Sequence, residues 1–185
     1  MDDILKYTGK TLIAHPLLND SFFTRSVIYV SQHSEEGSLG FVTNFKTQFL
    51  LRDVKPQMTK GNWPIYEGGP VASNQLFYLH RLGDKINDSL HIADDVYFGG
   101  DFNEIMYMIE HNEVTKSQLR FFAGYCGWAP DQLENEIKSK SWYVEDSIKS
   151  NLFEENHFEA WGEALSRKKE SLKLFSEISY GPSLN

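Results

Sequence analysis

The residue with the strongest intrinsic chemistry is the single cysteine, Cys126, which lies in the stretch RFFAGYCGWAPDQLENEI. The pattern predicts a strand followed by a helix there, and the positive end of a helix can lower the pKa of a nearby thiol. Catalysis by cysteine also needs a base, usually histidine, within hydrogen-bond reach. The sequence places none of the six histidines beside Cys126, so we expect a small buried apolar side chain rather than a nucleophile.

Other catalytic and metal-binding patterns are absent from the chain. The histidines show no HxH, HExxH or HxxxH spacing, and there is no second cysteine to complete a zinc site. The nucleophile-elbow pattern GxSxG is missing too. Acidic pairs such as Glu35–Glu36 and Asp94–Asp95 lie in predicted turns, where solvated side chains are the simpler interpretation. The sequence therefore predicts no catalytic residue, no metal and no cofactor.

Two glycine pairs, in EGGP at 67–70 and FGGD at 98–101, could let backbone N–H groups approach an anion. Neither matches GxGxxG or a P-loop, and the Asp101 carboxylate would lie where a phosphate would bind. EGGP is the stronger candidate because Pro70 makes it rigid and no helix cap is needed there. We predict that ligand-binding residues come from this turn, from polar side chains at strand ends and from the aromatic GYCGW turn. They are Asn44, Glu67, Gly68, Gly69, His80 and Tyr125.

Two function classes fit these residues. The favoured class is a non-enzymatic binding or regulatory domain that uses a cleft near the EGGP and GYCGW turns. The alternative is an enzyme acting on a small substrate there, with His33, His80 or Glu67 as the proton carrier. The enzyme requires at least two of these three groups to lie within reach of each other in one cleft.

Composition sets the wider limits. A chain of 185 residues that is 41% hydrophobic and 24% charged has enough apolar mass for one globular domain, so a single domain is predicted over residues 1–185. Its net charge of −8 and scattered basic residues disfavour direct nucleic-acid binding. With no long apolar run and no possible intrachain disulfide, we expect a cytoplasmic protein without a membrane segment.

Predicted strands come in neighbouring runs. Apolar, β-branched and aromatic segments bounded by turn residues predict strands at 9–15, 26–33, 38–45, 63–66, 76–81, 87–92, 96–100, 119–125 and 142–144. Because these runs are interrupted by only a few helices, they do not show strict βαβ alternation. The predicted class is α+β with a mixed, largely antiparallel sheet.

Helices are predicted from apolar residues three and four positions apart. Phe102, Ile105, Met106 and Ile109 form one such face, with Asp101 as the N-cap and Glu104 completing a capping box. A second helix should have Pro130 at its first position, after a turn at 127–129. A helical turn near residues 50–54 and C-terminal helices carrying Phe158, Trp161, Leu165, Leu174 and Ile178 complete the prediction.

Several of these segments follow one another in a distinctive order: GKTLIAHP, FFTRSVIYVSQHSEEGSLGFVTN, YEGGPV, FYLH, YFGGD and GYCGWAPDQLENEI, then Trp142. In this order they closely resemble the bacterial YqgE/AlgH family. The resemblance runs from about Gly9 to Trp161, and its most specific part is GGPV combined with GY-x-GW-x-x-x-QL-x-x-E.

The resemblance implies a compact α+β domain whose bifurcated sheet folds into a pseudo-barrel with flanking helices. It also implies a regulatory role, because members are often described as regulators of transcription, but it brings no established catalytic or DNA-contacting residue. Members usually carry alanine at the position of Cys126, which agrees with a structural role for that side chain. The partner is left open between a protein and a small molecule.

Overall fold

The computed structural model describes residues 6–146, 152–154 and 159–168. Its strands are β1 (Thr11–Ala14), β2 (Val27–Ser34), β3 (Gly37–Val42), β4 (Lys46–Leu50), β5 (Pro64–Glu67), β6 (Val71–His80), β7 (Leu90–Ala93), β8 (Val96–Phe98), β9 (Leu119–Trp128) and β10 (Trp142–Glu145). Its helices are α1 (Leu51–Val54), α2 (Phe102–Glu110), α3 (Gln132–Lys138) and α4 (Ala160–Lys168), with a 3-10 turn at Gly83–Lys85.

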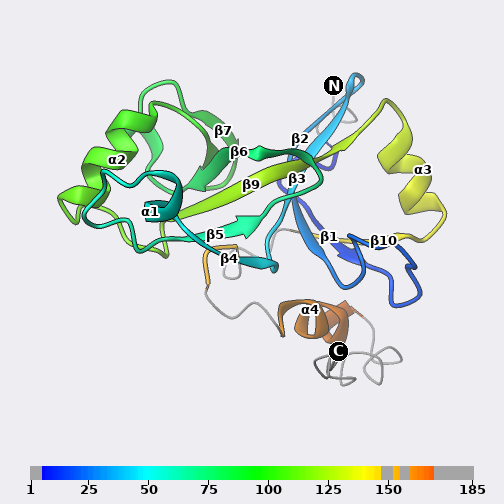
Figure 1. Ribbon diagram of the computed structural model, residues 1–185. Helices are drawn as coiled ribbons and strands as arrows, with labels where there is room; N and C mark the ends of the chain where they lie inside the picture. The colour runs from blue at the N-terminus through cyan, green and yellow to red at the C-terminus, as the bar shows by residue number, and fades with distance from the viewer. Residues whose placement is uncertain (1–5, 147–151, 155–158, 169–185) are drawn as a thin grey trace, which may run out of the picture.

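The strands form one mixed sheet in the order β10-β1-β2-β3-β9-β6-β8-β7, and β5 joins it beside β9 and pairs with β4. The β5–β9 pair is parallel and the other pairs are antiparallel. The predicted α+β class with a mixed, largely antiparallel sheet is therefore confirmed. Within the described residues the hydrogen-bonded order has two ends, β10 and β7, so the curved sheet is not closed (Figure 1).

The sheet divides at β9, because two different strands share one edge of it. Residues Phe121–Ala123 pair with Ile65–Glu67 of β5, and residues Cys126–Trp128 pair with Ser38–Gly40 of β3. The opposite edge of β9 pairs with β6. This shared edge is the bifurcation that the family resemblance implied, and it brings the GGP and GYCGW segments together.

Gly124 allows β6 and β9 to stay paired across an irregularity. The register runs from Val71 opposite Tyr125 to Leu76 opposite Ala123, so several β6 residues face one residue of β9. Gly124 has φ +72, and a Cβ there would lie 2.4 Å from the carbonyl oxygen of Gly69. Only glycine fits this left-handed, crowded position without strain.

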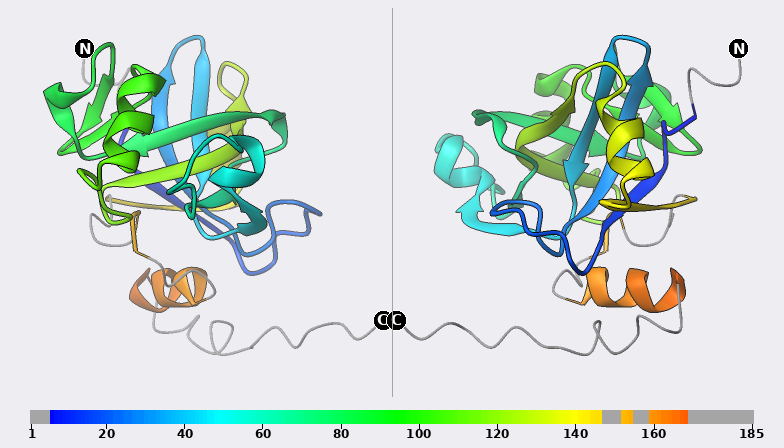
Figure 2. Two further views of the ribbon diagram at one scale, coloured as in Figure 1. Left: turned by 60° about the vertical axis from the view of Figure 1, so that its left-hand side comes forward. Right: turned by 90° about the vertical axis from the view of Figure 1, so that its right-hand side faces the viewer.

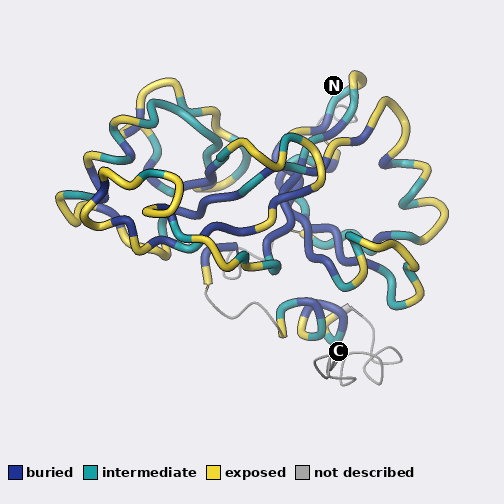
Figure 3. The backbone as a smooth tube through the Cα atoms, in the orientation of Figure 1, coloured by how far each residue is buried: buried dark blue, intermediate teal, exposed yellow. Residues whose placement is uncertain are grey.

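The core consists of three apolar clusters. The first packs β1, β2 and the end of β9 against α3 and α4. The second lies beneath α1 and α2. The third, built mainly of aromatic side chains, joins β2, β3, β5, β6, β8 and β9 with Leu152 and Phe153. Buried residues follow the central strands and exposed residues gather in turns and on outer helix faces (Figure 3).

Helices α2 and α3 lie at opposite ends of the molecule (Figure 1), and α4, drawn in orange, lies below the sheet in both views of Figure 2. Asp101 caps α2 as predicted, since its carboxylate accepts the N–H of Asn103 at 2.8 Å. The predicted capping box is wrong in its second half, because the Glu104 carboxylate accepts hydrogen bonds from Asn87 instead. This contact ties α2 to the loop that precedes β7.

The structure corrects two predicted boundaries and adds one strand. β9 continues to Trp128 because β3 provides a partner for its last residues, so the predicted turn at 127–129 begins later. α3 begins at Gln132, after Asp131 at φ +61, and Pro130 is not its first residue. β4 was not predicted; its short polar sequence gains a partner only through β5. Trp161 and Leu165 lie in α4 as expected, and Phe158, Leu174 and Ile178 fall outside the described residues.

Candidate functional site

The GGP turn packs directly on β9. The N–H of Gly68 donates to the carbonyl of Ala123, and the Gly68 carbonyl accepts the N–H of Val42, both at 2.8 Å. A Cβ at Gly68 would lie 2.3 Å from the carbonyl oxygen of Gly124, and one at Gly69 would lie 2.1 Å from the carbonyl carbon of Tyr125. The glycines are therefore required by the close approach of two backbones, whether or not a ligand binds there.

Cys126 lies beneath this turn. It is 1% exposed, and its thiol donates to the carbonyl of Gly68 at 3.3 Å. Burial raises the pKa of the thiol well above its ordinary value, which keeps it protonated and unreactive at neutral pH. The expectation that this cysteine is a buried apolar residue is confirmed.

The structure brings four of the predicted ligand-binding residues together, namely Glu67, Gly68, Gly69 and Tyr125. Asn44 lies nearby in the chain segment that contacts the turn, but its side chain bonds elsewhere. Its amide accepts the N–H of Val27 at 2.8 Å and donates to the carbonyl of Arg25 at 2.9 Å. Asn44 thus holds the start of β2 in place.

His80 lies apart from those residues, at the far end of β6. It is fully buried, with Nε2 3.0 Å from the carbonyl oxygen of Gly99 and Nδ1 3.2 Å from the N–H of Leu82. A neutral ring that donates through Nε2 and accepts through Nδ1 satisfies both contacts. Burial lowers the pKa of His80, against the smaller opposing effect of the Gly99 carbonyl, so the ring is held neutral.

The three candidate proton carriers of the enzyme hypothesis lie beside three different parts of β9. His80 pairs with Leu119, Glu67 pairs with Ala123, and His33 is opposite Ser38, which pairs with Trp128. Leu119 and Trp128 are separated by about 30 Å of extended strand. The geometry does not bring His33, His80 and Glu67 into one cleft.

Tyr125 belongs to a half-buried apolar surface that rests on the third core cluster. We call this the aromatic surface and define it by five partly buried side chains: Leu39, Phe77, Ile92, Phe98 and Tyr125. Phe77 stacks on Phe98 with ring centroids 6.4 Å apart and meets the edge of Tyr125 at 5.5 Å. The buried ring of Phe41 supports both Phe77 and Phe98.

Sequence reasoning missed the residues that surround His33. Its Nδ1 lies 2.8 Å from the hydroxyl of Ser38, and its Nε2 lies 3.1 Å from a carboxylate oxygen of Glu134. The hairpin between β2 and β3 puts Ser38 opposite His33. The short SEEG turn between these two residues is the sequence feature from which their pairing could have been predicted. Glu134 comes from α3, and only the fold could reveal its position.

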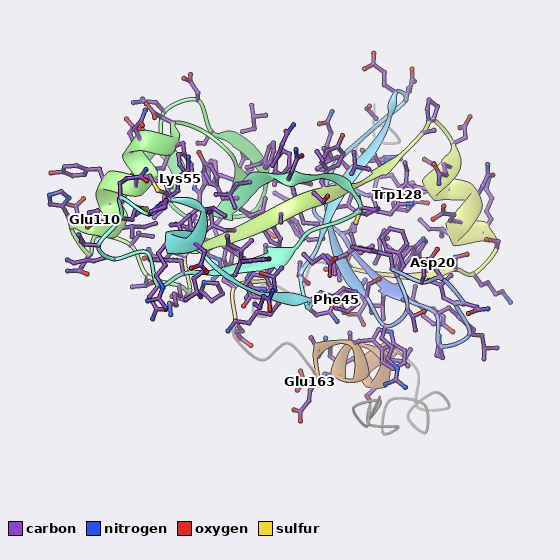
Figure 4. All side chains as sticks on the ribbon, in the orientation of Figure 1. Asp20, Phe45, Lys55, Glu110, Trp128 and Glu163 are labelled. Carbon is purple, nitrogen blue, oxygen red and sulfur yellow. The ribbon has the colours of Figure 1, made fainter. Side chains whose placement is uncertain are left out.

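The glutamate that ends the family motif has a structural role. One oxygen of Glu136 accepts the indole N–H groups of Trp128 and Trp142, at 2.9 and 2.7 Å, and the other accepts from Gln132. Trp128 lies where the end of β9 meets α3 (Figure 4). The GW-x-x-x-QL-x-x-E pattern is thus the set of contacts that fastens α3 to the sheet.

One hollow of the described residues lies on the α2 side of the molecule. It is an open depression of about 910 Å³ lined by Lys85, Asn103, Glu104, Tyr107, Met108 and Glu113. None of the predicted site residues lines it. The described parts of the chain also contain no group of three histidine, cysteine or acidic side chains placed to hold a metal ion, and no helix among them has the length and apolar character to span a membrane.

The described geometry is that of an α+β domain with a branched sheet, and comparison with known proteins gives its family. A family model described as AlgH-like matches residues 11–173. A UPF0301 protein of Parabacteroides distasonis is 37% identical over all of this chain and 94% of its own length, and one of Cytophaga hutchinsonii is 36% identical over 96% of this chain and 98% of its own. The chain therefore belongs to the AlgH-like family, the YqgE/AlgH family of the sequence prediction.

Two solved structures share the fold. The solution structure of the AlgH protein from Pseudomonas aeruginosa matches with a TM-score of 0.74 and 25% identity, covering 98% of this chain and 97% of that one. A crystal structure of a Corynebacterium diphtheriae protein matches with a TM-score of 0.76 and 24% identity, covering 93% of this chain and 92% of that one. The second likeness concerns the fold alone.

Proposed function

We propose that this protein is a cytoplasmic binding domain with a regulatory role, and that its aromatic surface receives an apolar group of a protein or small-molecule partner. The observation that supports the proposal is the Phe77–Phe98–Tyr125 ring cluster, which is only half buried yet fixed on a rigid sheet. Aromatic rings held in this way provide contact area at small entropic cost, and such residues dominate binding energy at interfaces.

Two exposed apolar residues extend the aromatic surface. Val71, opposite Tyr125, is 39% exposed, and Leu90, opposite Phe98, is 63% exposed. Beside them the GGP turn has no side chain at Gly68 and Gly69, so its backbone stays close to β9. A partner group placed on Tyr125 would therefore meet a flat apolar area bordered by a rigid turn and by the exposed carboxylate of Glu67.

Regulation through a partner agrees better with the charge than direct DNA binding does. The net charge of −8 repels a phosphate backbone. The cytoplasmic location is proposed on the single cysteine, which is buried and free and therefore suits a reducing compartment. Under this proposal any effect on transcription is indirect and passes through the molecule bound at the aromatic surface.

A thermal-shift screen with two matched variants tests the proposal. Tyr125→Ala removes one ring of the aromatic surface, and Tyr107→Ala removes an exposed tyrosine of α2, 57% exposed, as the control. A metabolite or apolar peptide present at about 100 times its Kd stabilises by about 2.7 kcal/mol, or roughly 5–10 °C for this chain length. We expect that shift for wild type and Tyr107→Ala, and its loss in Tyr125→Ala.

Each midpoint is compared with that of the same variant without ligand, so that lost packing at Tyr125 is not mistaken for lost binding. A ligand that shifts Tyr125→Ala as much as wild type would contradict the site. A comparable shift with a short DNA duplex at fixed salt would contradict the proposed indirect mode of regulation.

A further inference from the structure

Ser38, His33 and Glu134 form a continuous hydrogen-bonded chain at the junction of the β2–β3 hairpin and α3. We propose that this chain is an acyl-transfer site, in which Ser38 is the nucleophile, His33 its general base and Glu134 the residue that positions the base. The proposal does not depend on the aromatic surface. Ser38 is next to Leu39 in β3, but neighbouring side chains of a strand point to opposite faces of the sheet, and His33 and Glu134 come from β2 and α3.

The partners of His33 fix the direction of its hydrogen bonds. An ionised carboxylate can only accept, so the proton of the neutral ring must lie on Nε2, which is 3.1 Å from Glu134. Nδ1 then carries the free lone pair, and the Ser38 hydroxyl, 2.8 Å away, donates to it. The serine proton is thus already directed at the base that would remove it, as in a Ser–His–acid triad, although here the serine faces Nδ1 and the carboxylate faces Nε2, the reverse of the arrangement in serine proteases.

The ring and the backbone of His33 are each held by one further contact. The ring of Tyr7 packs edge-on against it with centroids 4.9 Å apart, and the backbone N–H of His33 donates to the Thr8 hydroxyl at 3.0 Å. His33 is 5% exposed and Ser38 9%, whereas the Glu134 side chain is 28% exposed. A base held in one orientation is preorganised for proton transfer.

The reaction balances with an ester and water as the only reactants. Ser38 Oγ attacks the ester carbonyl carbon while its proton passes to His33 Nδ1, and Glu134 stabilises the imidazolium through Nε2. The carbon–oxygen bond to the alcohol then breaks, and the alcohol leaves with the proton from Nδ1. Water attacks the acyl-serine in the same way, which releases a carboxylic acid and restores the Ser38 hydroxyl.

The limited exposure of Ser38 sets the class of substrate. Ser38 is 9% exposed, so a substrate has to be small around its carbonyl carbon to approach this residue. We therefore expect short acyl esters, such as acetyl esters with a good leaving group, to react. A purely structural lock between the hairpin and α3 would use the same contacts but would leave Ser38 unacylated, and this difference separates the two roles.

The experiment treats the folded full chain with p-nitrophenyl acetate, quenches it in acid and maps acetylation by peptide mass spectrometry, with nitrophenolate release followed in parallel. We expect acetyl-Ser38, or nitrophenolate release that Ser38→Ala removes, and at least a tenfold decrease in either signal in His33→Gln. Ser34→Ala is the matched control on the same hairpin, since the Ser34 hydroxyl bonds only within its own turn, and it should behave as wild type.

The role of Glu134 is tested by conservative rescue. Glu134→Gln should lose the Ser38 signal and Glu134→Asp should retain part of it, with thermal midpoints confirming that both variants are folded. Absence of both acetyl-Ser38 and Ser38-dependent nitrophenolate release in the folded wild type would overturn the proposal. Ser38 acetylation that is equal in wild type, His33→Gln and urea-unfolded protein would overturn it as well.

Discussion

At the scale of single residues, hydrogen-bond partners separate two buried histidines that look alike in sequence. His80 bonds to backbone groups at both ring nitrogens, so its environment is complete without a ligand. His33 bonds to a hydroxyl and a carboxylate, groups that can exchange protons with it. Both are candidate proton carriers on sequence grounds, but their neighbours cannot be predicted, because Gly99 and Glu134 reach them only in the folded chain.

His80 should make stability depend on pH. Burial lowers the pKa of His80 in the folded protein below the ordinary value of 6.5. At pH values between the lowered pKa and 6.5, the unfolded chain therefore binds a proton that the folded chain does not. The contribution to stability is complete above about pH 6.5 and is lost as pH falls from there toward the lowered pKa. Urea unfolding of wild type and His80→Gln between pH 8 and 5 measures this effect.

We expect the wild type to lose more stability than His80→Gln over that range, even though the variant is less stable at pH 8. Equal losses in the two proteins would show that protonation of His80 is not linked to unfolding. The comparison of slopes is needed because removing the buried ring also removes its packing and hydrogen bonds at every pH.

At the scale of elements, β9 organises the fold by pairing with three strands. Its sequence predicted a strand ending near Tyr125, because Gly127 and Pro130 indicate a turn. The strand continues to Trp128 because β3 supplies the missing partner. Strand pairing between distant segments has no local signal, and β4 was missed for the same reason, whereas α2 was predicted from its own apolar face and cap.

Gly124 should be the most sensitive glycine of β9. Gly124→Ala must keep φ +72 and place a Cβ 2.4 Å from the Gly69 carbonyl oxygen, while Gly99→Ala keeps φ +65 with nothing within 4 Å. We expect a loss of about 1–2 kcal/mol for Gly99→Ala from backbone strain alone, and of more than about 3 kcal/mol for Gly124→Ala. Chemical denaturation of both variants measures the difference. Equal losses would mean that the GGP turn does not press on β9.

At the scale of the whole molecule, the family and the fold class could be predicted from the sequence more fully than the candidate site. The family, the α+β class and the largely antiparallel sheet follow from ordered motifs and strand runs in the sequence. The branching at β9 came only from the family resemblance. The aromatic surface was represented in the prediction by Tyr125 alone, because Leu39, Phe77, Ile92 and Phe98 come from four other strands that meet only in the folded sheet.

The central claim, that the aromatic surface is where a partner binds, is tested most directly by site-specific photocrosslinking in cells. Benzoylphenylalanine is introduced in place of Tyr125, and in place of the exposed Tyr107 on α2 as the control. We predict a light-dependent adduct, detected by mass, from position 125 and none of the same mass from position 107. The same adduct from both positions, or none from position 125 in a folded protein, would contradict the account.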